Sequence, residues 1–379
     1  MRHPWTARSA LLAVAALAAC SPADAPVAPA AAPEAARAAG GTAPLYLVTF
    51  TDAVTDVRGV ARQMAARGGF ALAHVREHAA RGFSAVVPPP ALAALRSDPR
   101  VLLVEQDGPV QLDLPREHAR PPAGGGQQLS YGLTRVGGSG DGTGRTAWII
   151  DTGVDLDHPD LNTSRACHTS FVARGSDQSG DDGNGHGTHV AGIIAAKNNA
   201  IGTLGVAANA FVCAVRVLDN SGSGQWSWII DGVDYVARNG VAGEVANMSL
   251  GGSGTNATLE KAVADASRSV KFTISAGNSG ANANGFTPAR VNGANVYTIS
   301  AVDQRDCMPS WSNYGNPPVD YAAPGVGILS TYKGGGTKSL SGTSMAAPHV
   351  AGILLLGSVR ADGNASCDPD GTPDPIAHR

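Results

Sequence analysis

The chain has 379 residues, a length that accommodates two folded domains and additional segments. Hydrophobic residues make up 43% of the sequence and charged residues 16%, so a large core can be buried. The formal net charge is −3 and the aromatic content is 5%. These values argue against a nucleic-acid partner, because such proteins usually present a basic or base-stacking surface.

Residues 1–20 have the features of an export signal. Two arginines supply positive charge, and the apolar run 10–19 is too short to span a bilayer, which takes about 20 residues. The run ends in Leu-Ala-Ala-Cys, which resembles the lipobox of bacterial lipoproteins, where Cys20 would carry a lipid anchor. An ordinary small-residue cleavage site is the alternative. Both interpretations predict export, either as a secreted protein or as a protein anchored on the outer side of a membrane.

Export places the remaining four cysteines in an oxidising environment, where disulfides form. Four cysteines allow three pairings, and the sequence alone does not choose between them. We favour Cys167 with Cys213 and Cys307 with Cys367. A free buried thiol is the alternative for Cys213, because it lies in the apolar run 211–217.

Residues 21–43 consist almost entirely of Ala and Pro, and such a segment cannot bury enough apolar surface to fold. We expect it to be a linker. Residues 44–115 differ, because strand and helix patterns follow in the order βαββαβ. The expected strands are 45–50, 71–75, 82–87 and 101–105, and the expected helices are 57–66 and 91–97. This order predicts a small ferredoxin-like α+β sandwich, a fold that serves many functions.

The stretch 116–127 is rich in Pro and Gly and is expected to be an exposed linker. Exposed linkers are preferred sites of proteolysis, so we expect a processing site near residues 124–128. In residues 128–379 short apolar runs alternate with helical patterns. The continuous apolar run 147–150 ends at Asp151, as expected for a buried parallel strand that delivers a side chain at its carboxyl end. This alternation predicts a doubly wound, mostly parallel α/β sheet.

Three segments place a reactive side chain among small residues. Asp151 precedes Thr-Gly, His186 begins His-Gly-Thr-His-Val-Ala-Gly, and Ser344 lies in Gly-Thr-Ser-Met-Ala-Ala-Pro-His. A serine hydroxyl becomes a nucleophile when a histidine takes its proton and a carboxylate orients that histidine. Taken singly, each residue could be a strand-end, loop or helix-capping residue. The chain order Asp, His, Ser separates the pattern from α/β-hydrolases, and Ala346 replaces the second Gly of their G-x-S-x-G elbow.

These motifs resemble those of the subtilisin family, and most of all its proteinase K branch, over residues 130–352. The resemblance implies a subtilisin-like peptidase domain with Asp151, His186 and Ser344 as its catalytic triad. The segment Ser-Ala-Gly-Asn-Ser resembles the family segment that stabilises the oxyanion, which gives Asn278 that role beside the N–H of Ser344.

The resemblance also implies a role for the N-terminal sandwich. It would be an inhibitory propeptide that assists folding, blocks the active site with its C-terminal strand and is removed by self-cleavage. The expected function is therefore a serine endopeptidase that is made as a self-processing precursor. Its partners would be protein or peptide substrates and its own propeptide, and we expect a monomer whose chemistry needs no cofactor.

Substrate-binding residues follow from the same resemblance. An extended peptide would add a strand between two edges of the enzyme. The first edge contains Gly222, Ser223, Gly224 and Trp226, the opposite edge contains Ser249, Leu250, Gly251 and Gly252, and the pocket wall contains Ala276 and Gly277. Because these walls are small and uncharged, we expect a large apolar or aromatic side chain ahead of the cut.

Two places in the sequence contain residue types that can bind metal ions. His186 and His189 form His-x-x-His, but no Glu stands at metalloprotease spacing and no third ligand is evident, so zinc is not expected. By resemblance to the calcium site of proteinase K, Asp320 with the carbonyls of Ala294 and Val296 could hold a structural Ca²⁺. A solvated loop carboxylate is the alternative for Asp320.

The sequence supports two other functions less well. A scaffold on a decayed protease fold would lack a catalytic residue, and none is missing; an esterase is disfavoured by the chain order and by the glycines suited to strand pairing.

The sequence departs from the family after Ser344, where few residues follow. We expect a helix from residue 345 to about 360 and then a polar, Pro-rich tail, 362–379, with no obvious packing role.

Overall fold

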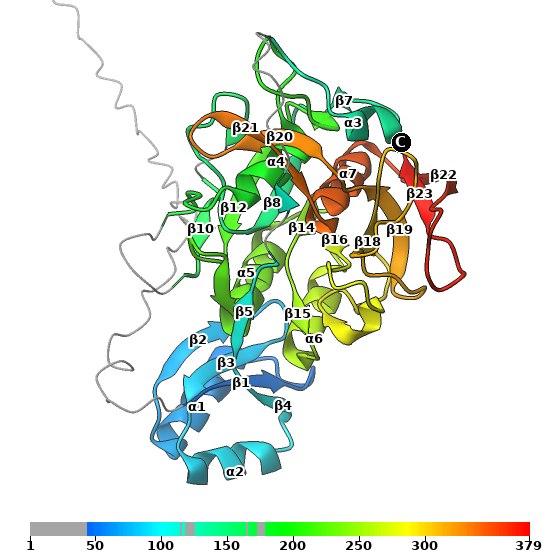
Figure 1. The fold of residues 1–379 in the computed structure, drawn as a ribbon. Coiled ribbons are helices and arrows are strands. Elements are labelled where there is room, and N and C mark those ends of the chain that lie inside the picture. Colours follow the sequence, from blue (N-terminus) through cyan, green and yellow to red (C-terminus); the bar gives the residue numbers. More distant parts are fainter. Residues whose placement is uncertain (1–43, 114–115, 118–125, 164–165, 173–178) are drawn as a thin grey trace, which may run out of the picture.

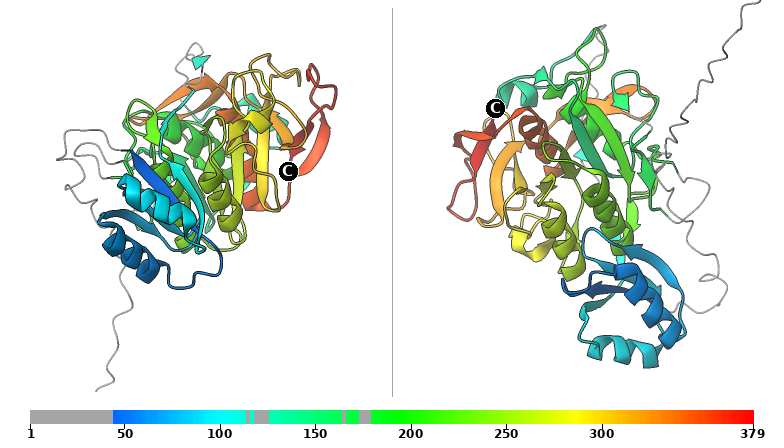
Figure 2. Two further views of the ribbon diagram at one scale, coloured as in Figure 1. Left: turned by 90° about the horizontal axis from the view of Figure 1, so that it is seen from below. Right: turned by 180° about the vertical axis from the view of Figure 1, so that it is seen from behind.

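The computed structural model describes residues 44–113, 116–117, 126–163, 166–172 and 179–379. The predicted signal with Cys20, the Ala/Pro-rich segment and most of the linker 116–127 lie outside the described residues. Figure 1 shows a small N-terminal domain below a large domain, and Figure 2 shows the same pair from two other sides.

The small domain is a four-stranded antiparallel sheet with two helices on one face. Its elements are β1 (Leu45–Phe50), α1 (Val57–Gly68), β2 (Leu72–Arg76), β3 (Gly82–Val86), α2 (Pro89–Ser97) and β4 (Val101–Gln106). The strand order β2-β3-β1-β4 confirms the predicted ferredoxin-like sandwich. Local signals set the ends of α1: Asp56 accepts from the N–H of Gly59 at 2.8 Å, and Gly69 ends the helix with φ 67°.

The large domain is built on a ten-stranded sheet. Its strands are β8 (Thr146–Asp151), β9 (Asn162–Thr163), β10 (Thr169–Ser170), β12 (Phe211–Arg216), β14 (Val245–Met248), β16 (Lys271–Ser275), β18 (Val296–Val302), β19 (Val319–Pro324), β22 (Arg360–Asn364) and β23 (Pro375–His378). The order is β10-β12-β8-β14-β16-β18-β19-β23-β22, with β9 beside β12. The strands pair in parallel except for β22 with β23, which confirms the predicted mostly parallel sheet.

Helices cover both faces of this sheet, as a doubly wound fold requires. The helices α5 (Trp226–Asn239) and α6 (Ala257–Ala266) pack on one face, and α4 (His186–Ala195) and α7 (Thr343–Leu356) pack on the other. Every residue of α4 is buried, as its largely apolar sequence predicts. A short helix, α3 (Tyr131–Arg135), and a 3₁₀ turn, Ala283–Gly285, complete the set. In the described part of the chain, no helix combines the length and the apolar character that crossing a membrane requires.

Several short strands form small sheets outside the two main sheets. They are β5 (Pro109–Gln111) with β13 (Ser223–Gln225), β6 (Arg116–Glu117) with β21 (Gly336–Ser341), β20 (Ile328–Tyr332) with β21, β7 (Gly140–Asp141) with β11 (Ala207–Ala208), and β15 (Gly252–Ser253) with β17 (Phe286–Thr287). Two of these pairs, β5–β13 and β6–β21, join the chain around the small domain to the large domain.

The C-terminal edge differs from the sequence-based expectation. The helix expected to reach residue 360 ends at Leu356, and the tail expected to have no packing role forms the hairpin β22–β23. This hairpin extends the large sheet because β23 pairs with β19, which buries Ile376 and Ala377. The pattern was hard to recognise because β23 is only four residues long and every residue of β22 is exposed.

Both favoured disulfides are present. Cys167 pairs with Cys213, so Cys213 is not a free thiol, and Cys307 pairs with Cys367. The second bridge ties the turn of the C-terminal hairpin to the loop after β18. It closes a loop of 60 residues, for which chain entropy predicts a stabilisation of about 4 kcal/mol.

Candidate active site

The carboxyl ends of three adjacent parallel strands gather the candidate site. In the sheet β8 lies beside β14, and β14 beside β16. Asp151 is the last residue of β8, Ser249 directly follows β14, and Asn278 lies three residues beyond β16. Because parallel strands end at one edge of a sheet, these side chains converge on that edge.

A buried acid–histidine pair forms at the end of β8. His186 Nδ1 lies 2.8 Å from Asp151 Oδ1, and both side chains are at most 1% exposed. The N–H of Thr152 also donates to Asp151 Oδ1, at 2.7 Å. A carboxylate on Nδ1 keeps the proton on that nitrogen, so Nε2 is left as the basic nitrogen of the ring.

Glycines allow α4 to begin against this strand. A Cβ at Gly187 would lie 2.0 Å from the carbonyl oxygen of Gly153 and 3.2 Å from Asp151 Cβ, so a larger residue would push His186 away from its acid. Gly153 itself has φ 107°, a left-handed conformation that favours glycine. The small residues around Asp151 and His186 thus have a steric reason.

A second buried carboxylate supports the pair, and sequence analysis did not identify it. Asp182 accepts hydrogen bonds from Thr152 Oγ1 at 2.9 Å, from Thr188 Oγ1 at 2.6 Å and from the N–H of Gly185 at 2.8 Å. Burial raises the pKa of Asp182, and these hydrogen bonds oppose that effect. The network holds the start of α4 against the loop after β8. The only sequence signal was an Asp four residues before His186.

Ser344 lies in the first turn of α7, which packs against α4. Its hydroxyl donates to the carbonyl oxygen of Ser249 at 3.2 Å, and Ser249 Oγ donates to the carbonyl oxygen of Ser344 at 2.8 Å. Among the described residues, His186 Nε2 is buried and has no hydrogen-bond partner. Catalytic hydrogen bonds often tighten only in the substrate complex, so this geometry leaves Nε2 free to accept the serine proton.

Two N–H donors converge beside Gly342. A Cβ built on Gly342 would lie 3.6 Å from Asn278 Nδ2 and 3.6 Å from the amide nitrogen of Ser344. The orientation of the Asn278 amide is fixed, because its Oδ1 accepts from the N–H and the hydroxyl of Thr343 at 2.8 and 2.9 Å. Two nitrogen donors therefore lie close to one small space, which is what an oxyanion hole requires.

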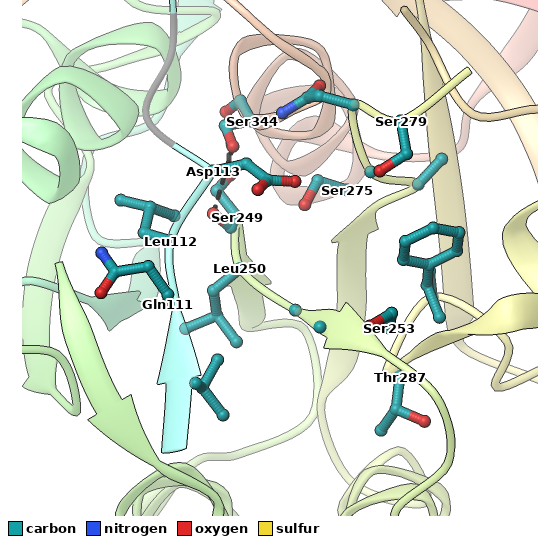
Figure 3. A pocket seen from close by; sticks show the side chains of 18 of the residues that line it. Gln111, Leu112, Asp113, Ser249, Leu250, Ser253, Ser275, Ser279, Thr287 and Ser344 are labelled. Atoms are coloured by element: carbon teal, nitrogen blue, oxygen red, sulfur yellow. Dashed lines mark hydrogen bonds between the residues drawn. The ribbon is translucent and has the colours of Figure 1, made fainter. Parts of the chain in front are cut away.

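A pocket of about 350 Å³ adjoins Ser344 and Asn278 (Figure 3). Nine of the predicted substrate-binding and catalytic residues line it: Trp226, Ser249, Leu250, Gly251, Gly252, Ala276, Gly277, Asn278 and Ser344. Ser253, Ser275, Ser279, Phe286, Thr287 and Ala289 also line it and were not predicted. Gly222, Ser223 and Gly224 lie at β13, beside the N-terminal tail described next.

Residues 109–113, which follow the small domain, occupy this cleft. The strand β5 pairs with β13 in antiparallel register, with Val110 opposite Gly224, and the N–H of Leu112 donates to the carbonyl oxygen of Gly222 at 2.8 Å. Val110 and Leu112 are buried, whereas Asp113 lies in Figure 3 between Ser344 and Ser275. The tail thus lies as an extended peptide that leads to Ser344.

Carboxylates of the small domain bind the starts of α5 and α6. Glu105 accepts from the N–H groups of Ala257 and Thr258 at 3.0 and 2.8 Å, and Asp107 accepts from the N–H and hydroxyl of Ser227 at 2.9 and 2.6 Å. Both acids satisfy N–H groups that a helix start leaves unpaired, and both lie at the positive end of the helix dipole. Burial raises the pKa of Asp107, and the hydrogen bonds from Ser227 oppose that effect.

The large domain supplies acceptors in return. Asp234 of α5 accepts from the N–H of Ala79 at 2.7 Å, and Asp265 of α6 accepts from the N–H of Ala80 at 3.1 Å. Ala79 and Ala80 are fully buried in the large domain's core cluster with α5 and α6. The contact between the two domains is therefore reciprocal and includes both carboxylates and apolar side chains.

The His-x-x-His pair is engaged elsewhere. His189 Nε2 faces the carbonyl oxygens of Ile328 and Lys338 at 3.1 and 2.9 Å, so it is a donor, and burial lowers the pKa of His189 to about 3. His186 uses Nδ1 for Asp151. Within the described ranges, no three His, Cys, Asp or Glu side chains gather where they could hold a metal ion.

The proposed calcium ligands lie away from this cleft. Asp320 is in β19, where it accepts from the N–H of Thr298 at 2.8 Å. Ala294 and Val296 lie just before and at the start of β18, the strand that pairs with β19. Burial raises the pKa of Asp320 to about 6, with the Thr298 N–H in opposition.

Comparison with known proteins identifies the family. The sequence model of the subtilase family matches residues 142–363, which is more than half of the chain and contains every catalytic candidate. The chain belongs to the subtilase family. It is accordingly a serine peptidase, and its large domain has the subtilisin-like fold.

Relatives of this subtilase include proteases from bacteria and from a fungus. It is 43% identical to alkaline serine exoprotease A of Vibrio alginolyticus over 74% of this chain, although the match spans only 52% of that protein. It is 37% identical to proteinase R of Parengyodontium album, over 78% of this chain and 75% of that protein. It is 46% identical to subtilisin Savinase of Lederbergia lenta, over 61% and 84%.

A solved structure agrees with this assignment. The crystal structure of a cold adapted subtilisin-like serine proteinase matches with a TM-score of 0.56 and 41% sequence identity. The match covers 63% of this chain and 89% of that chain. The subtilisin-like domain is thus shared nearly whole.

Proposed function

We propose that this subtilase is an exported, self-processing endopeptidase whose triad is Asp151, His186 and Ser344. The observation that carries the proposal is the buried pair of His186 Nδ1 and Asp151 Oδ1 at 2.8 Å, in which Nε2 has no hydrogen-bond partner among the described residues and α4 packs against α7, the helix of Ser344. Export is supported by the signal-like residues 1–20 and by two disulfides.

The proposed mechanism begins with attack by Ser344 Oγ on the substrate carbonyl carbon. His186 Nε2 takes the serine proton, and Asp151 stabilises the imidazolium that forms. The developing oxyanion enters the space beside Gly342, where Asn278 Nδ2 and the N–H of Ser344 donate to it. His186 then gives its proton to the leaving amine, and water resolves the acyl-enzyme by the same steps in reverse.

The substrate is proposed to be an extended peptide that adds a strand to β13, as β5 does. Ala276, Gly277, Gly251 and Gly252 give the pocket small walls, which suit an apolar or aromatic side chain ahead of the cut. The small domain is proposed to be the inhibitory propeptide, because its tail fills the cleft that substrate would need.

A structural calcium ion is proposed at Asp320 with the carbonyls of Ala294 and Val296. Asp320 is mostly buried with one hydrogen bond to its carboxylate, and its pKa is raised, so a cation would stabilise its charged form. The ion would stabilise the fold and take no part in catalysis.

One experiment tests the central proposal. Ser344→Ala should abolish hydrolysis of a peptide substrate and labelling by a fluorophosphonate probe, and the precursor should remain at full length. Wild type, expressed alone and in parallel, should be labelled and processed. Normal self-processing of the Ser344→Ala variant without another protease present would sink the proposal.

A further inference from the structure

The tail in the cleft indicates where the precursor first cuts itself. We propose that the first self-cleavage breaks the peptide bond that follows Asp113, and that Val110 and Leu112 are the side chains that set this position. The inference rests on the proposed self-processing by Ser344. It differs from the cut expected near residues 124–128.

The register of the tail leads to Asp113. Val110 pairs with Gly224, Gln111 with Ser223, and the N–H of Leu112 donates to the carbonyl oxygen of Gly222. A strand advances about 3.3 Å per residue, so these pairs fix the position of the next residue of the tail along the cleft to within one residue. That residue, Asp113, lines the same pocket as Ser344 and Asn278. Asp113 differs from the apolar or aromatic side chain proposed ahead of the cut in other substrates, so the burial of Val110 and Leu112, and not the fit of the residue ahead of the cut, selects this bond.

Two buried side chains prevent the tail from slipping. Val110 is 3% exposed and Leu112 is 4% exposed, and both belong to the core cluster that contains α5. Gln111 points the other way, and Ser223 Oγ donates to its Oε1 at 2.6 Å. A shift by one residue would bury the Gln amide and expose both aliphatic side chains, which the alternation of a strand makes unfavourable.

The chain continues on the other side of Ser344. Arg116 pairs with Ser341 and Glu117 with Leu340, in the strand that ends three residues before Ser344. The bond that reacts therefore lies between Asp113 and Arg116. Of the three bonds in this interval, two include Pro115, whose ring crowds the bond at its nitrogen and fixes its φ. The bond after Asp113 is the one that remains.

The end of the linker is held away from the catalytic histidine. Gln127 Nε2 donates to the carbonyl oxygens of Lys197 and Thr203 at 2.6 and 2.8 Å, and the N–H of Gln128 donates to the carbonyl oxygen of Gly202. Lys197 follows the last turn of α4, a ten-residue helix about 15 Å long that begins at His186. A first cut at residues 124–128 would require this anchor to detach, whereas a cut after Asp113 does not.

The chemical step is that of the proposed mechanism applied to the enzyme's own chain. Ser344 Oγ bonds to the carbonyl carbon of Asp113, the bond from that carbon to the nitrogen of residue 114 breaks, and His186 transfers the serine proton to that nitrogen. Water then adds to the ester carbon, its proton passes through His186 to Ser344 Oγ, and Asp113 leaves with a new α-carboxylate.

The test is a time course of purified precursor followed by intact-mass and N-terminal analysis. The first pair of products should be a fragment ending at Asp113 and a partner beginning at Leu114, with a first-order rate that does not depend on protein concentration. First products that end within residues 120–128, or anywhere other than Asp113, would overturn the inference while leaving the proposed function intact.

Variants sharpen this test. Val110→Asp and Leu112→Asp should each slow the first cut at least tenfold, because they place a carboxylate where the tail is buried. Val241→Asp makes the same change at a valine that is 59% exposed and away from the cleft, and its rate should stay within about twofold of wild type. If the first cut were equally fast in Val110→Asp and Val241→Asp, burial of the tail would not set the position of the cut. A wild-type chain that hydrolyses no peptide and leaves the fluorophosphonate unreacted would instead refute the proposed function.

Discussion

The large domain presents two functional surfaces that are built in different ways. The cleft depends on single atoms: one hydrogen bond between His186 and Asp151, and two donors beside Gly342. The docking face on α5 and α6 distributes its contacts over at least four carboxylates and a patch of apolar side chains. Replacing a cleft residue should therefore lower the catalytic rate strongly and change folding little. Replacing one docking residue should weaken the contact between the two domains only modestly, because the neighbouring contacts remain.

The largest expected effect is at Asp151, the proposed acid of the triad. Asp151→Asn should lower kcat about ten-thousand-fold, because an amide can hold the histidine in the wrong tautomer. KM should change little, since the peptide-binding strand β13 is unaltered. The variant would be processed by added wild-type enzyme, purified and assayed on a peptide substrate.

Asp181→Asn is the matched control for this acid, because Asp181 is exposed and lies close to the site in the same loop as Asp182. It should retain activity within a few fold. If kcat of Asp151→Asn fell by less than about tenfold, another carboxylate would orient His186. The cleft would then not depend on this single hydrogen bond, and the comparison of the two surfaces would be wrong on that point.

The next effect is at Asn278, the proposed oxyanion donor. Asn278→Ala should lower kcat by about 100- to 1,000-fold, a loss typical of removing one such donor, with KM nearly unchanged. Asn292→Ala, at an exposed loop position, should behave as wild type. If Asn278→Ala instead raised KM and kept kcat, Asn278 would be a ground-state binding residue and its place in the cleft would need another explanation.

A docking residue should have a smaller effect. Glu105→Gln keeps the shape of the side chain but loses the charge that faces the start of α6, so the processed small domain should dissociate about tenfold more readily. The measurement is the active fraction of the processed complex as it is diluted. Glu77→Gln, whose partner is Arg58 within the small domain, should leave this curve unchanged. A hundredfold effect from Glu105 alone would mean that the docking face also depends on one contact.

The smallest effect concerns Asp320, which lies in neither surface. Its pKa of about 6 in the folded chain exceeds the ordinary value of 3.8, so the folded state binds more protons between these pH values and stability falls as pH rises through them. In chelator at pH 7, Asp320→Asn should therefore unfold at a higher temperature than wild type. The difference should disappear near pH 4.

Calcium should act in the opposite direction. Adding Ca²⁺ should raise the thermal midpoint of wild type and not that of Asp320→Asn, because a ligand that binds only the native state stabilises it by mass action. Equal midpoint shifts in the two proteins would remove Asp320 from the site. Peptide hydrolysis by the folded enzyme should be the same with and without the ion.

The difference between the two surfaces also explains how well each could be predicted. Asp151, His186, Ser344 and Asn278 could be proposed from the sequence because each lies in a segment of small residues whose close packing constrains the sequence. The docking acids Glu105, Asp107, Asp234 and Asp265 carry no such signature, because a carboxylate that meets a helix start of another domain looks in sequence like any surface acid. Asp182 was missed for the same reason.

By itself, the sequence determined the two folds, the order of their elements and the catalytic candidates. These features depend on local patterns: apolar runs of strand length, helical spacing, and glycines where backbones must approach closely. The tertiary structure decided the ends of the elements and the partners across the fold. It placed the C-terminal tail as a hairpin on β19, because that pairing depends on an edge formed far away in the sequence. It also placed Asp113 beside Ser344, since the register of a strand in a cleft is set by the side chains the cleft can bury, which no local pattern records.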